Sequence, residues 1–520
     1  MAILIKNGII FDGSGQKGER TDVLIEGDKI SAIGALAKKK AEIVIDASGL
    51  YLTPGFIDIN SDSDHYLTIF TQPSQSSLLE QGITTVLTGN CGSSLAPLVK
   101  GNLISLRKWS DPNQINIDWQ SFGEFLEKLS RFKIGVNFGT LIGHSTIRRG
   151  IIGEEFRDLT EPELKEMKYL VEKSLAEGAF GVSTGLSYSH SRITPQYEIL
   201  EIAKIIEKYN GLYSTHLRSE KEGLLAAIAE LEDLVSEFKD FPKIEISHLK
   251  AYVGLEDDLN QSLKLINDLK NRGVDINFDV YPYQTTANPL YTYLPSWAVY
   301  GGMELMIKNI SNRTVRQRVI KELKERPYDF SKIIVAEALK FPSLVGKSIA
   351  ELASKRNVDF EEMLLDILVF SGGRATVFEA NLSENGIEAL FKNPLSLIAT
   401  NGPGFNNAQN DSFLAHQRSF GAFPKFLGLA RDRKLMSWPE AIKKITSEPA
   451  KKIGLRKRGL IKKGYFADLV ILNPDTINSG ATLQNPYLRP EGIKFVILNG
   501  QLVVKESLAT GILAGQIFKR

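Results

Sequence analysis

The sequence predicts an α/β protein built on a closed eight-stranded (β/α)8 barrel, with β segments at both ends of the chain. Three observations lead to this prediction. Eight short apolar runs typical of strands alternate with amphipathic helical patterns in the middle of the chain. Short strand patterns separated by turn residues occupy both ends. The alternative, an open doubly wound sheet, would carry a glycine fingerprint after its first strand, and none is present.

The composition describes a globular protein and argues against two classes of partner. Hydrophobic residues make up 43% of the 520 residues, which is enough for a full core. The 63 Lys and Arg nearly balance the 61 Asp and Glu, so no basic field attracts nucleic acid or an anionic membrane. One cysteine allows no internal disulfide, and neither a signal peptide nor a long apolar segment is evident. We therefore expect a cytoplasmic protein, as a monomer or small homo-oligomer.

Both ends of the chain have short strand patterns separated by turn residues. Residues 1–53 alternate apolar runs with Gly, Asp and Lys turns, as in a small antiparallel sheet. Residues 456–520 contain further strand patterns, two of them joined by an Asn499-Gly500 hairpin turn. These segments predict either one domain closed by both ends or two independent caps.

The middle region, residues 54–455, carries the barrel pattern. Its strand-like runs are residues 55–59, 83–87, 134–140, 179–184, 212–215, 244–247, 276–280 and 395–400. A helix is expected after residue 160, because Thr160 and Glu163 form a capping box with Pro162 in the first turn and Gly178 ends the pattern. Eight alternations with right-handed crossovers favour a closed barrel.

One connection is exceptional. The segment between the seventh and eighth strands, about 284–394, is too long for a loop and has its own helical patterns. We expect an inserted lid or subdomain that covers the catalytic face of the barrel.

A barrel carries its chemistry at the C-terminal ends of its strands. Those ends are, in order, residues 60–65, Cys91, His144, Tyr188, His216, His248 with Lys250, residues 281–283, and Asn401. Four of the six histidines occur at these points. Cys91, His216 and His248 would offer a thiolate and two imidazoles, a ligand set for Zn²⁺ with one position left for water. The alternative is a cysteine that only packs and histidines that only bond the backbone.

Several motifs are similar to one known family. They are PGFID at 54–58, TGNCGSSLAP at 88–97, IGHSTIRRG at 142–150, FGVSTGLSY at 180–188, YSTHLRSE at 213–220, ISHLKAY at 246–252, DVYPY at 279–283, GAFPKFLG at 421–428 and GLIKKGYFADLVIL at 459–472. Together they resemble the N-acyl-D-amino-acid deacylases (D-aminoacylases) of the amidohydrolase superfamily, over nearly the whole chain. The resemblance implies a zinc-binding barrel, a small β-sandwich built from residues 1–53 and 456–520, and an insertion near strand seven. It also implies a tightly held zinc with ligands at Cys91, His216 and His248, and hydrolysis of an N-acylated D-amino acid.

The chain departs from the family on one side of the site. The family's His-x-His pair is replaced by Asn60 and Asp62, and its catalytic Asp near strand eight is replaced by Asn401. An amide side chain cannot accept the proton that hydrolysis requires at neutral pH. Asn60 and Asp62 still offer oxygens to a second, weaker metal, and Asp62 or Asp64 is a candidate for the missing base. The alternative for these carboxylates is a turn or capping role.

The substrate's carboxylate requires a cation. Lys250 is one candidate, and Arg418 is another, although Gln417 stands where the family has a proline. Tyr283 resembles a family tyrosine that contacts this carboxylate, and Tyr188 resembles one that polarises the scissile carbonyl. The alternatives are surface charges and tyrosines that only pack.

Two functions from different classes follow. The first is a zinc amidohydrolase that acts on a small N-acyl amino acid or related amide. The second is a non-catalytic descendant that keeps the fold and zinc and acts by binding. A dihydroorotase-like or hydantoinase-like enzyme is a weaker third, because a carboxylated lysine usually bridges two metals there and Cys91 stands in that place. We expect one zinc; without the His-x-His pair the sequence offers little support for a second.

Overall fold

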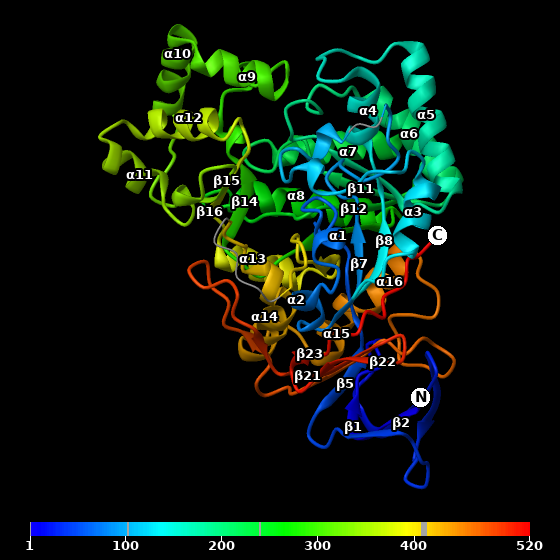
Figure 1. The fold of residues 1–520 in the computed structure, drawn as a ribbon. Helices are drawn as coiled ribbons and strands as arrows, with labels where there is room; N and C mark the ends of the chain where they lie inside the picture. Colours follow the sequence, from blue (N-terminus) through cyan, green and yellow to red (C-terminus); the bar gives the residue numbers. More distant parts are fainter. Residues whose placement is uncertain (1, 101–102, 239–240, 407–412) are drawn as a thin grey trace.

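A ring of parallel strands occupies the centre of the computed structural model, which describes residues 2–100, 103–238, 241–406 and 413–520 (Figure 1). The ring consists of β6 (Phe56–Asp58), β7 (Ile83–Thr88), β8 (Asn137–Thr140) continued by β9 (Ile142–Gly143), β10 (Gly181–Gly185), β11 (Leu212–His216), β12 (Lys243–Ile246), β13 (Ile276–Val280) and β17 (Ser396–Ile398). Each of the eight predicted strands is present. The barrel prediction is confirmed.

The strands pair in sequence order around the ring. One ladder joins β6, β7 and β8, and a second runs from β9 through β10, β11, β12 and β13 to β17. Two backbone hydrogen bonds bridge the gaps between these ladders, from Phe180 to Thr140 (3.1 Å) and from Asn401 to Asn60 (2.8 Å). Every described pairing in the ring is parallel, as crossover connections require.

Helices cover the outside of the ring. They are α1 (Thr68–Thr71), α2 (Ser76–Leu79), α3 (Phe122–Ser130), α4 (His144–Ile152), α5 (Glu161–Ala176), α6 (Gln196–Lys208), α7 (Leu224–Ser236), α8 (Glu256–Asn271), α13 (Glu384–Lys392), α14 (Arg418–Asp432), α15 (Trp438–Ile445) and α16 (Ser447–Ile453). The expected start of α5 is confirmed, because the Thr160 amide donates to the Glu163 carboxylate at 2.8 Å. Short 3-10 helices lie at Ile104–Leu106 and Pro112–Gln114.

The two chain ends meet in one nine-stranded sheet. Its strands are β1 (Ala2–Ile10), β2 (Glu19–Glu26), β3 (Lys29–Gly34), β4 (Ile43–Asp46), β5 (Tyr51–Pro54), β18 (Leu469–Leu472), β21 (Ile493–Leu498), β22 (Gln501–Lys505) and β23 (Leu508–Ala509). The antiparallel pairing of β5 with β18 joins the N-terminal strands to the C-terminal ones. The ends therefore form one continuous sheet with its own apolar core, at the bottom of Figure 1, and not two separate caps. A further pair, β19 (Asn478–Ser479) and β20 (Pro490–Glu491), stands apart from it.

The long segment between β13 and β17 folds as a lobe. It contains the antiparallel strands β14 (Thr285–Pro289), β15 (Ile333–Ala338) and β16 (Ala375–Ala380) and the helices α9 (Gly302–Ser311), α10 (Arg313–Lys324), α11 (Ile349–Arg356) and α12 (Phe360–Phe370). Short 3-10 helices occupy Leu290–Tyr293, Ser296–Ala298 and Pro342–Leu344. The lobe has a hydrophobic core of its own and lies at the upper left of Figure 1.

The interior of the barrel is apolar in one part and polar in another. Ile57, Leu87, Phe180, Leu212 and Leu397 pack together in one buried cluster. At the C-terminal ends of the strands the buried residues are instead polar, and they build the site described next. Among the described residues, no helix has the length and apolar character needed to cross a lipid bilayer.

Candidate metal centre

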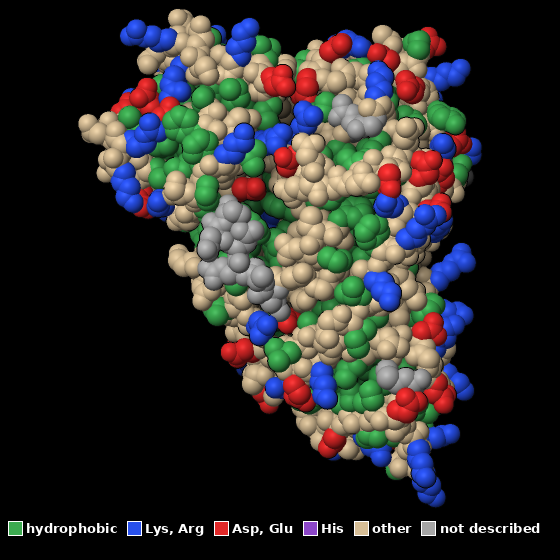
Figure 2. Space-filling view, in the orientation of Figure 1, with side chains coloured by type: hydrophobic (Ala, Val, Ile, Leu, Met, Phe, Trp, Pro, Cys, Tyr) green, Lys and Arg blue, Asp and Glu red, His purple; other side chains and the backbone are tan. Residues whose placement is uncertain are grey.

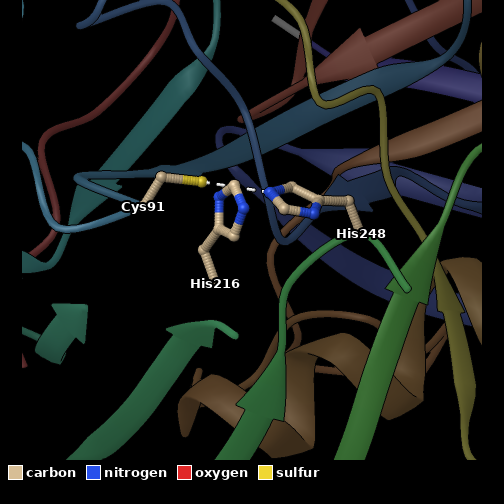
Figure 3. A group of neighbouring side chains, drawn as sticks. All are labelled: Cys91, His216 and His248. Carbon is tan, nitrogen blue, oxygen red and sulfur yellow. Dashed lines mark hydrogen bonds between the residues drawn. The ribbon is translucent and has the colours of Figure 1, made fainter. Parts of the chain in front are cut away.

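Cys91, His216 and His248 converge at the mouth of the barrel (Figure 3). Cys91 follows β7, His216 is the last residue of β11, and His248 follows β12. One potential ligand atom from each lies within 4.8 Å of the other two, and Cys91 Sγ is 3.2 Å from His248 Nε2. The two imidazole rings meet edge to face with centroids 4.3 Å apart. All three side chains are buried.

The turn after β7 directs the thiol inward. Cys91 and His248 both adopt positive φ, 52° and 40°, a conformation that costs a non-glycine residue about 1–2 kcal/mol. Gly92 is required beside Cys91, because a Cβ there would lie 2.7 Å from the backbone nitrogen of Gly185. Strained backbone after two strands that approach each other across the barrel mouth indicates a site whose geometry is held by the surrounding fold.

One carboxylate orients both imidazoles. Glu220 lies 2.9 Å from His248 Nδ1 and 3.3 Å from His216 Nε2, and Ser187 Oγ is 2.7 Å from the same Nε2. With these nitrogens engaged, His248 Nε2 faces the thiol and His216 Nδ1 is buried with no hydrogen-bond partner among the described residues. The site thus offers the Cys91 thiol, His248 Nε2 beside it and the unpartnered His216 Nδ1, while Glu220 contacts the other nitrogen of each ring. This set of ligand atoms fits a zinc ion.

The protonation states agree with this arrangement. Burial lowers the pKa of His216 to about 4, which keeps its ring neutral, the form that binds a metal. Burial also raises the pKa of the Cys91 thiol well above its usual value. A cation at the site would be needed to favour the thiolate.

Glu220 also engages Lys250. The ammonium donates to both oxygens of Glu220, at 2.8 and 2.7 Å. Burial alone would raise the pKa of Glu220, but Lys250 and the two imidazoles hold it well below its usual range. Lys250, predicted to contact the substrate, is thus committed to Glu220. Sequence reasoning gave Glu220 no role, although it follows His216 by four residues within YSTHLRSE.

The two substituted positions share a different carboxylate. Asp279, within β13, accepts a hydrogen bond from Asn60 Nδ2 at 2.9 Å and one from Asn401 Nδ2 at 2.6 Å. The two amides thus share one carboxylate side chain, and all three residues are buried. Sequence reasoning missed Asp279, which stands at the start of DVYPY.

The two candidate bases have different surroundings. Asp64 accepts the backbone amides of His65 at 2.9 Å and Gly89 at 2.8 Å, one on each oxygen, so it holds the local turns. Asp62 instead lies 3.1 Å from His65 Nδ1 and 3.9 Å from Arg418 Nη2, with 15% of its side chain exposed. Asp62 is therefore the one with access to the mouth of the barrel.

Aromatic residues line the two sides of the centre. The ring of Tyr188 meets His216 with centroids 5.1 Å apart. On the other side, the guanidinium of Arg418 lies 4.8 Å from the centre of the Tyr281 ring. The Tyr283 hydroxyl is 3.5 Å from Ser479 Oγ. The structure thus brings Tyr281, rather than Tyr283, against Arg418.

Comparison with known proteins shows which proteins this chain resembles. Residues 407–504 match the model of the amidohydrolase family. The chain is 30% identical to a D-aminoacylase from Alcaligenes xylosoxydans xylosoxydans, over 100% of this chain and 97% of the relative. It is 28% identical to an N-acyl-D-aspartate deacylase of the same organism, over 96% and 91%. A solved structure from work on the binuclear metal centre of D-aminoacylase superposes with a TM-score of 0.83 at 27% identity, covering 100% and 99%.

The barrel, the extra β sheet and these similarities define an amidohydrolase. Within that class the full-length match is specific. The chain belongs to the family of D-aminoacylases, the N-acyl-D-amino-acid deacylases.

Proposed function

We propose that this protein is a zinc-dependent amidohydrolase that cleaves the amide bond of an N-acylated D-amino acid. The observation that carries the proposal is the convergence of Cys91, His216 and His248 at the mouth of the barrel, with Glu220 behind both imidazoles. One relative is named a D-aminoacylase and another an N-acyl-D-aspartate deacylase. The solved D-aminoacylase structure is described by one-metal activation and second-metal attenuation, which is compatible with a single zinc here.

In this proposal the residues around the ion have separate roles. Zinc held by Cys91, His216 and His248 would supply Lewis-acid chemistry that makes water a nucleophile at neutral pH. Arg418, whose guanidinium lies over the Tyr281 ring, would hold the substrate's α-carboxylate. Tyr188, whose ring contacts His216, would donate a hydrogen bond from its hydroxyl to the carbonyl oxygen as negative charge develops there.

Asp62 is the residue we assign to proton transfer. Asn401 cannot accept a proton at neutral pH, and both oxygens of Asp64 already bond backbone amides. Asp62 is at the mouth and is oriented by His65. It would take a proton from the attacking water and return it to the leaving amine.

One observation favours the second candidate, a protein that binds zinc and ligand without turnover. Asn60 and Asn401 both donate a hydrogen bond to Asp279, so the half of the site that lost its family residues forms a hydrogen-bonded group of its own, in which Asn60 Oδ1 has no partner among the described residues. A descendant of this kind would gain hydrolysis only after Asn401→Asp, Asn60→His and Asp62→His are introduced together.

Metal content and turnover test these proposals together. Zinc in the purified protein is counted by mass spectrometry, and release of acetate or formate is followed across N-acetyl and N-formyl D- and L-amino acids. The hydrolase predicts about one zinc per chain and turnover that Asp62→Asn removes while the zinc stays. Zinc without turnover on any amide supports the binding protein. Absence of zinc contradicts both.

A further inference from the structure

A large cavity lies between the barrel and the inserted lobe. Its volume is about 920 Å³, a size typical of sites that bind small molecules. The proposed metal ligands Cys91, His216 and His248 do not line it, and neither do Asp62 and Arg418. Figure 2 shows the notch between the lobe and the barrel, with acidic and basic side chains at the surface beside it. The cavity is therefore a candidate binding site separate from the metal centre.

The two sides of the cavity differ in chemistry. The barrel side supplies cations from the segment after β7 and from α4, which are Arg107, Lys108 and Arg149. The lobe side supplies a group of apolar side chains from α9, α12 and the segments near them, which are Val299, Met303, Met306, Ile307, Leu339 and Val369. A cavity with cations on one side and hydrocarbon on the other suits a ligand with one charged end and one apolar end.

Lys108 is the buried cation on the barrel side of this cavity. It follows the short helix Ile104–Leu106, is 6% exposed, and its ammonium has no hydrogen-bond partner among the described residues. The ammonium lies 3.4 Å from the centre of the Tyr188 ring. A buried charge without an anion is strongly unfavourable, so this position favours a ligand that brings negative charge. Sequence reasoning gave Lys108 no role.

Arg149 adds a second hydrogen-bond donor to the same side. Its Nη2 pairs with Glu154, but its Nε is buried and has no hydrogen-bond partner within the described part of the chain. Burial and then the positive charge of Arg149 lower the pKa of Lys108 to about 7, so the two cations lie close enough to repel each other. Burial, Arg149 and Lys108 lower the pKa of His190, which also lines the cavity, well below its usual value.

The acids of the cavity do not balance these cations. Five Lys and Arg side chains line the cavity, against three Asp and Glu. Two of the acids are already engaged, because Glu154 pairs with Arg149 and Asp111 lies 3.7 Å from Arg374. The third, Glu304, is exposed on α9. The cavity therefore has an excess of positive charge that an anion would neutralise.

We propose that this cavity binds an amphipathic organic anion, a carboxylate with a hydrocarbon body, at a site separate from the metal centre. The carboxylate would accept hydrogen bonds from Lys108 and Arg149 on the barrel side. The hydrocarbon would pack against Met303, Ile307 and Val369 of the lobe. The flexible lysine stem allows the ammonium to turn from the Tyr188 ring toward the cavity. Such a ligand would contact both the barrel and the lobe.

Three matched compounds test the two ends of the ligand. Octanoate has both the charge and the hydrocarbon, octanamide lacks the charge, and acetate lacks most of the hydrocarbon. Calorimetry on the purified protein should show octanoate binding at least about tenfold more tightly than either of the others. Lys108→Met should remove the preference over octanamide, and Met303→Gln should reduce the preference over acetate. Lys308→Met, at an exposed position of α9 that does not line the cavity, should change neither.

The variant Cys91→Ala separates this site from the metal centre, because a carboxylate could also bind zinc. Octanoate binding that persists in Cys91→Ala and weakens in Lys108→Met supports the inference. Loss of octanoate binding in a folded Cys91→Ala protein overturns it, as does unchanged binding in a folded Lys108→Met protein. Equal affinity of the wild-type protein for octanoate and octanamide, or no binding of octanoate, overturns it as well. These outcomes do not depend on whether the protein hydrolyses an amide.

Discussion

Replacing Glu220 by Gln removes the carboxylate that holds one side of the proposed metal centre. Glu220 lies 2.9 Å from His248 Nδ1 and 3.3 Å from His216 Nε2, and it receives two hydrogen bonds from Lys250. Glutamine keeps one acceptor oxygen but presents an NH₂ group where the partners are also donors. Loss of such an outer partner costs about 10- to 100-fold in metal affinity, or about 1.4–2.8 kcal/mol.

The same change leaves Lys250 buried without its counterion. Breaking a buried ion pair on one side costs about 3–5 kcal/mol, so the free energy of unfolding is expected to fall along with zinc affinity. Zinc affinity is measured by competition with a chromophoric chelator, and stability by thermal unfolding with and without zinc. Glu222→Gln, at an exposed position two residues away, is the control. A folded Glu220→Gln protein with wild-type zinc affinity would refute the role given to Glu220.

Two further results are expected. Cys91→Ala should reduce zinc from about one per chain to nearly none with an unchanged circular dichroism spectrum; a retained zinc would contradict the ligand assignment. Asn401→Asp places another carboxyl group against Asp279, which already faces Glu245, in place of an amide that donates at 2.6 Å. A carboxyl pair of this kind has a raised pKa in the folded protein and destabilises it as pH rises. The melting temperature should therefore fall further below wild type at about pH 8 than at about pH 5, and equal differences at both would contradict this.

The barrel could be predicted from the sequence because each of its strands and helices is set by residues close together in the chain. Each strand is a short apolar run, and the start of α5 is set by Thr160 and Glu163 within one helical turn. Parallel strands in a closed ring put all their C-terminal ends at one mouth. Cys91, His216 and His248 could therefore be expected to approach one another before any distance was known, and in the structure they do.

The sequence by itself thus determined the order of strands, the family resemblance and the set of residues at the mouth of the barrel. Only the tertiary structure decided which side chains contact each other there: Asn60 and Asn401 share Asp279, and Tyr281 rather than Tyr283 meets Arg418. Nor could a sequence show that the buried Lys108 ammonium has no hydrogen-bond partner in the part of the chain that the structure describes. The reason is physical: strand periodicity sets which end of the barrel a residue occupies, whereas hydrogen bonds depend on side-chain direction and on ångström distances between residues far apart in the chain.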